Sequence, residues 1–303
     1  MTDRPTKTLL IGRGYWGSKL ERYLRESPLF DLVKVMGKEG DTETDRALHR
    51  QDVEAVVIAT PIDTHYNLAR RALLAGKHVL VEKPLALTSG EAWDLVRLRQ
   101  DEGKILMVDY VQTFAPSIVE ALEYLPSIGP VRYVEAETSH LGRFGMGSNV
   151  YWLLASHWLA VVNEVRPLDA LTWTQEKYLT GEDGLTTKGM IVGSDMAGAF
   201  CSVRVSLDTP GKVMTLTIYG ELGVIQWDAQ GDPVLSVVFH DRKPRALPAE
   251  LGSLRLQGRF DERHNLRQAL GSFRDCLQGR RQDNAAAAAL VTQTIEEATK
   301  GTR

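Results

Sequence analysis

The stretch Thr8-Leu9-Leu10-Ile11-Gly12-Arg13-Gly14-Tyr15-Trp16-Gly17 decides the fold of this chain. A short apolar segment leads into three glycines with the spacing G-x-G-x-x-G, and a helical pattern follows over residues 18–26. A strand that passes through such glycines into a helix is the arrangement that binds a dinucleotide pyrophosphate. Gly12 allows a tight turn, Gly14 lets bare backbone approach the phosphates, and Gly17 lets the helix pack against the strand. The spacing alone also fits a glycine-rich turn without a ligand.

The first third of the chain alternates short apolar runs with helical patterns. Strands are expected at residues 8–11, 32–36, 55–59, 78–81 and 105–108, and helices at 18–26, 45–50, 65–75 and 89–102, with Ser89 as the cap of the last helix. This alternation predicts a parallel sheet with helices on both faces. Ligands of such sheets bind at the carboxyl ends of the strands, so the residues directly after each strand are the first candidates for function.

Beyond Pro116 the pattern changes. Helices are expected over 117–125, 150–162, 261–277 and 284–298, a strand over 131–139, and mainly strands from 171 to 240, punctuated by Gly, Pro and Asp. We therefore expect an α/β chain with a doubly wound Rossmann domain over residues 1–115 and an α+β domain over residues 116–303. The second domain should hold a large, mostly antiparallel open sheet. One face of such a sheet would be exposed unless a second copy of the chain covered it. We therefore predict a homodimer or homotetramer formed through this sheet.

Composition restricts the class of protein. The 303 residues include 36 basic and 39 acidic ones, and this balance gives no reason to expect nucleic acid or an anionic membrane as partner. No apolar run approaches the roughly 20 residues that span a bilayer, and the N-terminal residues lack the apolar core of a signal peptide. The two cysteines, Cys201 and Cys276, imply neither a disulfide framework nor a metal site. These features predict a cytoplasmic protein with a small-molecule substrate.

Two of the expected strand ends carry residues suited to chemistry. Ala59-Thr60-Pro61 follows the third apolar run, with His65 four residues beyond, and Glu82-Lys83-Pro84 follows the fourth. A lysine at the carboxyl end of a central strand is placed to meet a nicotinamide or its substrate, and a Lys-Pro bond permits a cis peptide. Taken alone, Lys83 fits a surface lysine in a turn better.

In combination these phrases resemble the Gfo/Idh/MocA oxidoreductase family. The likeness runs through residues 10–17, 59–61 and 78–86, continues through 108–116 and 128–131, and is weakest over 171–260. The resemblance implies a Rossmann domain, a second domain with a large open sheet, and oxidation or reduction of sugars, cyclitols or related molecules with NAD or NADP. Together with the glycine spacing it leads us to expect the cofactor against the following residues: Gly12, Arg13, Gly14, Tyr15, Trp16, Gly17, Gly37, Lys38, Thr60, Pro61, His65, Glu82 and Lys83. It also gives Lys83 a catalytic role at the substrate or nicotinamide.

A second family motif ends in a histidine that often acts as the acid/base. The matching stretch is Asn149-Val150-Tyr151-Trp152-Leu153-Leu154-Ala155-Ser156-His157, which resembles N-V-x-W-D-L-x-P-H in members that act on nucleotide-linked sugars. The resemblance thus implies that His157 is catalytic. However, Leu153 stands where the pattern has Asp. Residues four apart share a helix face, so the usual carboxylate would lie beside the imidazole.

Leucine can neither accept a proton nor orient an imidazole, and three interpretations stay open. In the first, His157 and Lys83 suffice for the family's reaction without the carboxylate, because imidazole exchanges protons near neutral pH. Alternatively the reaction differs, for example reduction of an imine or enone in a biosynthetic pathway. In the third interpretation the chain binds cofactor without turnover, as a sensor or a partner subunit. His157 is also compatible with a buried structural histidine.

The end of the second apolar run bears on the choice of cofactor. NAD-specific folds place Asp or Glu there to bond the ribose 2′-OH. Here Gly37 holds that position and Lys38 follows, so a 2′-phosphate meets no carboxylate there and can pair with Lys38. Glu39 would serve NAD if the loop differs. The sequence therefore favours NADP, with NAD possible, and Arg13 is expected over the adenine or near the 2′-phosphate.

Further residues are weaker candidates for substrate contact: Tyr110, His140, Arg143, Asn149 and Trp152. Tyr110 carries a phenol directly after an expected strand, and His140 and Arg143 follow a strand expected to border the cleft. Trp152 and Trp158 flank His157, which fits the wall of a sugar pocket as well as core packing.

Overall fold

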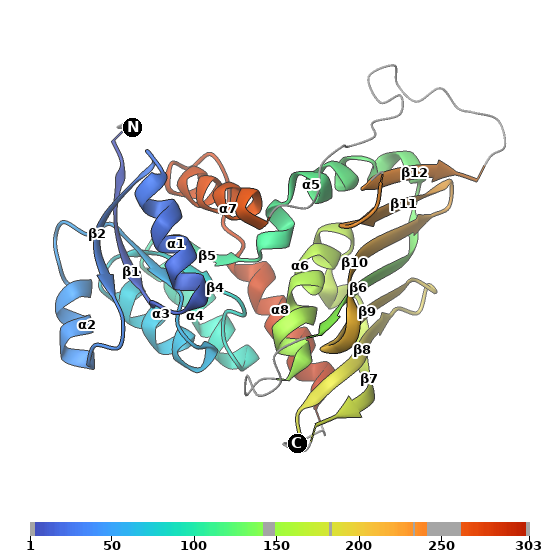
Figure 1. Cartoon of the computed structure of the whole chain (residues 1–303), viewed down its shortest axis with the longest axis horizontal. Coiled ribbons are helices and arrows are strands. Elements are labelled where there is room, and N and C mark those ends of the chain that lie inside the picture. Colours follow the sequence, from blue (N-terminus) through green and yellow to red (C-terminus); the bar gives the residue numbers. More distant parts are fainter. Residues whose placement is uncertain (1–3, 142–148, 182–183, 233, 241–261, 301–303) are drawn as a thin grey trace. The chain divides into compact units, whose positions relative to one another are not determined.

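The computed structural model describes residues 4–141, 149–181, 184–232, 234–240 and 262–300 (Figure 1). They form two compact units, residues 1–111 with 266–293, and residues 112–265 with 294–303. The first boundary falls near the one expected at 115–116, whereas much of the C-terminal helical segment groups with the first unit. Each unit is built around its own sheet.

The first unit contains a five-stranded parallel sheet in the order β2-β1-β3-β4-β5. Its strands are β1 (Thr6–Ile11), β2 (Phe30–Met36), β3 (Ala55–Ile58), β4 (His78–Glu82) and β5 (Leu106–Asp109). The central strands read as continuous apolar runs because helices cover both faces, and all four residues of β3 are buried. The expected doubly wound parallel sheet is confirmed.

Helices connect these strands. They are α1 (Tyr15–Glu26), α2 (Asp41–Leu48), α3 (His65–Leu74) and α4 (Ser89–Asp101), and the chain ends in α7 (Glu262–Leu277) and α8 (Ala285–Thr299). The strand order reverses at β1, so α1 and α3 lie on opposite faces of the sheet (Figure 1). Within the described ranges, no helix is long and apolar enough to cross a membrane.

The cap of α4 differs from the expectation. The Thr88 side chain, rather than that of Ser89, accepts a hydrogen bond from the Glu91 amide at 3.2 Å. Thr88 has extended backbone geometry, whereas Ser89 already belongs to the helix. The prediction of Ser89 was wrong because both residue types cap helices, and only the backbone decides which of two neighbours does so.

The edge strand β5 is paired by the C-terminal segment of the chain. The Asn284 side chain accepts from the Val108 amide at 2.7 Å and donates to the Val108 carbonyl at 2.9 Å. Asp283 accepts from the Leu106 amide at 3.3 Å. An open strand edge would otherwise expose unpaired backbone groups. These contacts explain why a segment so distant in sequence completes the first unit.

The second unit contains a seven-stranded sheet in the order β12-β11-β10-β6-β9-β8-β7. The strands are β6 (Val131–Leu141), β7 (Thr172–Thr180), β8 (Thr186–Ser194), β9 (Phe200–Ser206), β10 (Asp208–Gly220), β11 (Gly223–Asp228) and β12 (Leu235–Phe239). Every neighbouring pair is antiparallel except β6 and β9, which run parallel. The expected mostly antiparallel sheet is confirmed. The unit's helices are α5 (Pro116–Glu123) and α6 (Ser156–Val165).

Candidate cofactor site and active site

The glycine loop at the end of β1 is packed too tightly for side chains at two positions. Gly12 has a φ of +116°, and a Cβ there would lie 2.1 Å from the Ala59 carbonyl oxygen. A Cβ on Gly17 would lie 2.2 Å from the Gly12 carbonyl oxygen. These two glycines therefore let β1, β3 and α1 approach one another closely, as the sequence predicted for such a loop.

Gly14 differs, because its Cα faces open space. Apart from its chain neighbours and the backbone of its own helix, no heavy atom of the described residues lies within 4 Å of the position that a Cβ would take there. Gly14 is also the N-cap of α1, provides no capping side chain, and is followed by a first turn without acidic residues. The amides of that turn and the positive end of the helix dipole are therefore not covered by a side chain of Gly14. These features fit the pyrophosphate of a dinucleotide.

The start of α1 also carries a cation that the sequence analysis missed. The Lys19 Nζ lies 4.2 Å from the ring centroids of both Tyr15 and Trp16. The two rings meet edge to face at 5.7 Å, and Tyr15 is 74% exposed. The i,i+4 spacing of Tyr15 and Lys19 was the available signal. The result is an additional positive charge fixed over two aromatic rings near the helix N-terminus.

The region after β2 brings together the residues that bear on cofactor choice. A Cβ on Gly37 would lie 3.8 Å from the Arg13 Cδ and 3.8 Å from a Glu39 carboxylate oxygen. The Arg13 side chain therefore extends to Gly37, and Lys38 beside it is exposed. Because cations and a carboxylate meet at this point, the local charges are compatible with either nicotinamide dinucleotide.

The end of β3 is held by a short hydrogen-bonded turn. The Thr60 Oγ1 lies 2.6 Å from the Thr64 Oγ1, and the Thr64 hydroxyl donates to the Pro61 carbonyl. The turn is completed by the one-turn helix Ile62–Thr64. Thr60 is partly buried, and Pro61 is exposed. The turn thus fixes the backbone that follows the third strand.

His65 is buried between two backbone carbonyls. Its Nδ1 lies 2.8 Å from the Pro84 carbonyl oxygen and its Nε2 lies 2.9 Å from that of Thr60. A neutral imidazole can donate to only one of them, whereas the imidazolium donates to both. Burial lowers the pKa of His65, and the positive charge of Lys83 acts in the same direction. His65 thus ties the end of β3 to the loop after β4, which positions Lys83.

Lys83 is half-buried and precedes a cis peptide bond to Pro84. Burial lowers the pKa of its ammonium to about 8, and the carboxylates of Glu82 and Asp109 oppose that shift. Asp109, only 3% exposed, is the register partner of Glu82 across β4 and β5. Lys83 is therefore a cation at neutral pH that gives up its proton far more readily than an ordinary lysine.

His157 lies in the second unit, in the first turn of α6. Ahead of α6, the Asn149 side chain accepts a hydrogen bond from the Tyr151 amide at 3.0 Å. Residues Tyr151–Ala155 then form a π-helical turn before α6. Leu153 and His157 are both half-buried. π-Helical turns are rare and frequently occur at functional sites.

The weaker candidates have distinct environments. Tyr110 is 1% exposed, and burial raises the pKa of its phenol. Trp158 is fully buried, donates to the Thr138 hydroxyl and meets Trp227 edge to face at 5.8 Å, so it packs in the core. Trp152 and His140 are half-buried. Arg143 lies outside the described residues.

In the first unit, the structure brings the sequence-predicted cofactor residues to one edge of the sheet. The glycine loop, Gly37, Thr60 and Lys83 follow β1, β2, β3 and β4, and parallel strands end at a common edge. His140, Asn149, Trp152 and His157 belong to the second unit.

Residues 6–110 match the model of the Gfo/Idh/MocA family, described as an oxidoreductase family with an NAD-binding Rossmann fold. Over this range the chain is similar to the Gfo/Idh/MocA family. The resemblance inferred from the motifs is therefore confirmed. A similar relative is 2,7-anhydro-N-acetylneuraminate hydratase of Mediterraneibacter gnavus, which is 31% identical over 138 residues, 41% of this chain and 37% of the relative. The matched segment spans only about a third of the length of such curated relatives.

Solved structures extend the likeness to the whole chain at the level of the fold. GenD2 from gentamicin A biosynthesis, solved in complex with NAD, has a TM-score of 0.82 and 23% identity, covering 99% of this chain and 96% of that one. The 3-ketoreductase KijD10 from Actinomadura kijaniata, solved with TDP-benzene and NADP, has a TM-score of 0.79 and 17% identity, covering 99% and 98%. At these identities the comparison establishes the fold alone.

Proposed function

We propose that this chain is an NADP(H)-dependent oxidoreductase acting on a small polar substrate of sugar or nucleotide-sugar type. A hydride would pass between the nicotinamide and a carbonyl or carbinol carbon. The observation that carries the proposal is the pairing, on one sheet edge, of an open glycine backbone at Gly14 with a lysine of lowered pKa at Lys83. The first element suits a pyrophosphate, and the second suits a polarised oxygen.

The roles of the residues follow from their chemistry. The cofactor supplies or accepts the hydride. Gly12, Gly14 and Gly17 hold its phosphates on the start of α1. Lys83, kept cationic beside Glu82 and Asp109, polarises the substrate oxygen, and His65 holds its loop in place. His157 exchanges the proton of that oxygen, because imidazole titrates near neutral pH.

We assign NADP rather than NAD as the preferred cofactor. Arg13 extends to Gly37, and Lys38 adds a second cation, so a 2′-phosphate would find two positive partners. Glu39 is the feature that favours NAD. Both cofactors occur on this fold, since GenD2 was solved with NAD and KijD10 with NADP.

The experiment that tests the proposal is calorimetry of the purified chain with NADPH and NADH titrated separately. Tight NADPH binding with weak NADH binding is expected, and it would justify a screen of carbonyl substrates. Tight binding of NADH instead would overturn the cofactor preference alone. Binding of neither would overturn the oxidoreductase proposal, because the glycine loop would then serve another purpose.

Leu153 favours a second candidate function. Without the carboxylate of the family motif beside His157, an imine or enone reductase, or a cofactor-binding sensor or partner subunit, also fits the residues. The name of the hydratase relative indicates that a similar Rossmann segment occurs in proteins with another named activity. Hydride exchange with a ketose or aldose by the purified chain would exclude the non-catalytic candidate. Turnover of imines but not of sugars would favour the imine reductase.

We also propose that the chain forms a homodimer or homotetramer through the seven-stranded sheet. Helix α6 covers the face of β6 that carries Thr138, whereas Tyr133 alternates to the opposite face. There Tyr133 stacks on Tyr219 at 5.3 Å and meets Phe200, which is 37% exposed. A second copy would cover these rings. A monomer in light scattering would oppose this assembly.

A further inference from the structure

Strand β8 carries two glycines whose missing side chains make room for aromatic residues. Gly189 and Gly193 are four residues apart, so they face the same side of the sheet. A Cβ on Gly193 would lie 2.7 Å from the Trp173 ring of the neighbouring strand β7. A Cβ on Gly189 would lie 2.0 Å from the Tyr151 hydroxyl oxygen. Because Tyr151 belongs to the π-helical turn ahead of α6, Gly189 lets a separate element dock on the sheet.

The Tyr151 side chain is fully buried and bonded to the β7–β8 pair. Its hydroxyl donates to the Glu176 carbonyl at 2.8 Å. Glu176 is the register partner of Met190 across the two strands. Burial raises the pKa of the phenol to about 12, and the Met190 backbone opposes this shift. The hydroxyl is therefore a neutral donor near pH 7, held at the point where β7 and β8 pair.

The backbone of Tyr151 joins this anchor to the residues of the candidate active site. Its amide donates to the Asn149 side chain at 3.0 Å, and its carbonyl accepts from the Ser156 amide in the pattern of the π-helical turn. The Ser156 hydroxyl also donates to the Trp152 carbonyl at 2.9 Å. His157 follows Ser156 directly. Tyr151 thus connects the sheet to the segment that carries all three candidates for substrate contact or catalysis.

His157 is held by a different strand. The next residue, Trp158, is fully buried and donates to the Thr138 hydroxyl of β6, which fixes the first turn of α6 there. The π-helical turn is fixed on β7 and β8 instead. Such turns are rare, and without the Tyr151 anchor an α-helical turn could replace this one. Because each residue of an α-helix turns the chain by about 100°, the loss of one residue from the turn would rotate the segment ahead of α6 by about that angle relative to His157.

We propose that Tyr151, packed over Gly189, is a positioning residue of the substrate site. It holds Asn149 and Trp152, the expected substrate contacts, in the orientation toward His157 that the reaction needs. This role rests on the proposed function, because it requires that these residues meet the substrate and that His157 exchanges its proton. Tyr151 itself acts only through them, since its hydroxyl is bonded to the sheet and its side chain has no exposed surface.

Two substitutions remove the anchor in different ways, and a third is the matched control. Tyr151→Phe removes the hydroxyl alone. Gly189→Ala places a methyl group where the hydroxyl lies. Gly193→Ala places a methyl group against the Trp173 ring, on the same face of the same strand, and its nearest atoms do not belong to Tyr151. Thermal unfolding should show a lower Tm for all three variants, so a loss of stability alone does not distinguish them.

The first readout needs no substrate. The full chain is prepared with isotope-labelled histidine, and the imidazole NMR signal of His157 is identified by its absence from His157→Asn. We expect this signal to shift in Tyr151→Phe and in Gly189→Ala, because the residues around the imidazole move. It should keep its position in Gly193→Ala. An unmoved signal in both anchor variants would overturn the proposal, whatever the chain catalyses.

The second readout is steady-state kinetics with NADPH and a carbonyl substrate. Tyr151→Phe and Gly189→Ala should lower kcat/KM for the carbonyl substrate about 10- to 100-fold, since small displacements of positioning groups cause losses of this size. The KM for NADPH should stay unchanged, because the glycine loop belongs to the other unit. Gly193→Ala should change neither quantity. An equal loss of kcat/KM in Gly193→Ala would assign the effect to stability and overturn the positioning role.

A double variant separates stability from positioning. The atom nearest to the new Cβ of Gly189→Ala is the Tyr151 hydroxyl oxygen, so adding Tyr151→Phe should recover part of the lost Tm. It should recover none of the lost kcat/KM, since the anchor is still absent. Parallel recovery of both quantities would overturn the proposal. If the unchanged chain turns over no substrate, the proposed function fails, and the imidazole signal still decides whether Tyr151 sets the surroundings of His157.

Discussion

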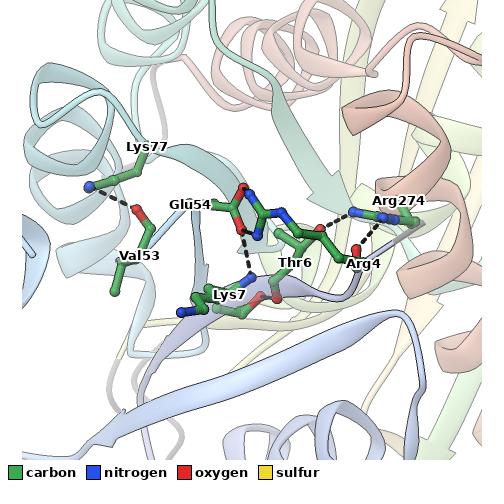
Figure 2. Close-up of polar contacts among 8 residues, drawn as sticks. Arg4, Thr6, Lys7, Val53, Glu54, Lys77 and Arg274 are labelled. Carbon is green, nitrogen blue, oxygen red and sulfur yellow. Dashed lines mark hydrogen bonds and ion pairs between the residues drawn. The ribbon is translucent and has the colours of Figure 1, made fainter. Parts of the chain in front are cut away.

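The two edges of the five-stranded sheet present polar groups in different ways. At the carboxyl edge the glycine loop presents backbone amides and the start of a helix, and Gly14 leaves the space open. At the amino edge side chains line a cavity of about 640 Å³, where Lys77 and Arg274 are buried against oxygens of the chain (Figure 2). The backbone loop can be recognised in the sequence from its glycine spacing. A cluster of side chains joins residues from distant segments, so no spacing in the sequence reveals it.

The largest expected effect concerns Lys83 at the carboxyl edge. Lys83→Ala should lower turnover about 10²- to 10⁴-fold, because it removes the group that polarises the substrate oxygen. Cofactor affinity should change only a few-fold, since the glycine loop remains. Steady-state kinetics together with calorimetry would measure the two quantities. Lys212→Ala serves as the control for loss of a lysine. Equal losses of turnover and cofactor affinity would contradict the assigned role.

The next largest effect separates packing from binding in the glycine loop. The new Cβ of Gly17→Ala would lie 2.2 Å from the Gly12 carbonyl oxygen. Because this clash involves backbone, the variant should lower the free energy of unfolding by about 3 kcal/mol. Gly14→Ala is the matched variant, since its Cβ would meet no non-neighbouring atom within 4 Å in the part of the chain that the structure describes. Its free energy of unfolding should differ by less than about 0.5 kcal/mol from that of the unchanged chain, yet it should bind cofactor about tenfold more weakly. Chemical denaturation and calorimetry measure both. Unimpaired cofactor binding by Gly14→Ala would place the phosphates elsewhere.

The pH dependence tests the environment of Lys83. Its pKa of about 8 means that the ammonium form persists below that pH and is lost as the pH rises through it. The rate of carbonyl reduction should therefore fall above pH 8, about tenfold per pH unit. Lys83→Arg keeps its charge throughout, so any residual activity should lack this fall. A pH profile is the measurement, and an identical fall in Lys83→Arg would assign it to another group.

A smaller effect is expected at Gly37. Gly37→Asp fits sterically, because the nearest atoms to the new Cβ lie 3.8 Å away. The carboxylate would bond a ribose 2′-OH and repel a 2′-phosphate, which should shift the ratio of NADPH to NADH affinities about tenfold toward NADH. Lys38→Gln is the matched variant and should weaken NADPH alone. Calorimetry with both cofactors decides, and an unchanged ratio in both variants would locate the 2′ group elsewhere.

The smallest effect distinguishes two neighbours at the start of α4. Thr88→Ala should lower the free energy of unfolding by about 1 kcal/mol, because the Glu91 amide loses its cap. Ser89→Ala should change it by less than about 0.5 kcal/mol. Urea denaturation of the two variants gives the comparison. A larger loss of unfolding free energy in Ser89→Ala than in Thr88→Ala would show that Ser89 is the cap.

The features that sequence could predict are those with a local signature. The strands of the first unit are short apolar runs followed by punctuation, and the glycine spacing marked the loop before α1. The role of Asp109 was missed, because its effect on Lys83 depends on the register between β4 and β5. Strand β11 lies within residues 171–240, where strands were expected, but its own bounds were not predicted, since its polar and apolar residues alternate over only six positions next to other short strands.

Other features depend on contacts between distant segments. Nothing near Asn284 indicates that it pairs with Val108, so the sequence assigned the C-terminal helices wholly to the second domain. The cavity at the amino edge escaped notice for the same reason, because Thr6, Lys77 and Arg274 are far apart in the chain. The assignment of Lys83 and His157 to one reaction stays a prediction that the variants above address.

The pairing of Asn284 with the edge strand has a consequence for biosynthesis. A ribosome completes all of β1 to β5 early, but it releases the residues that close the β5 edge only after residues 112–265 of the second unit have been made. During that interval the nascent chain exposes the amide and carbonyl of Val108 on an open edge, where another nascent strand can add. The first unit is therefore the first to begin and among the last to be finished, and a chain cut short before Asn284 would retain an adhesive sheet edge.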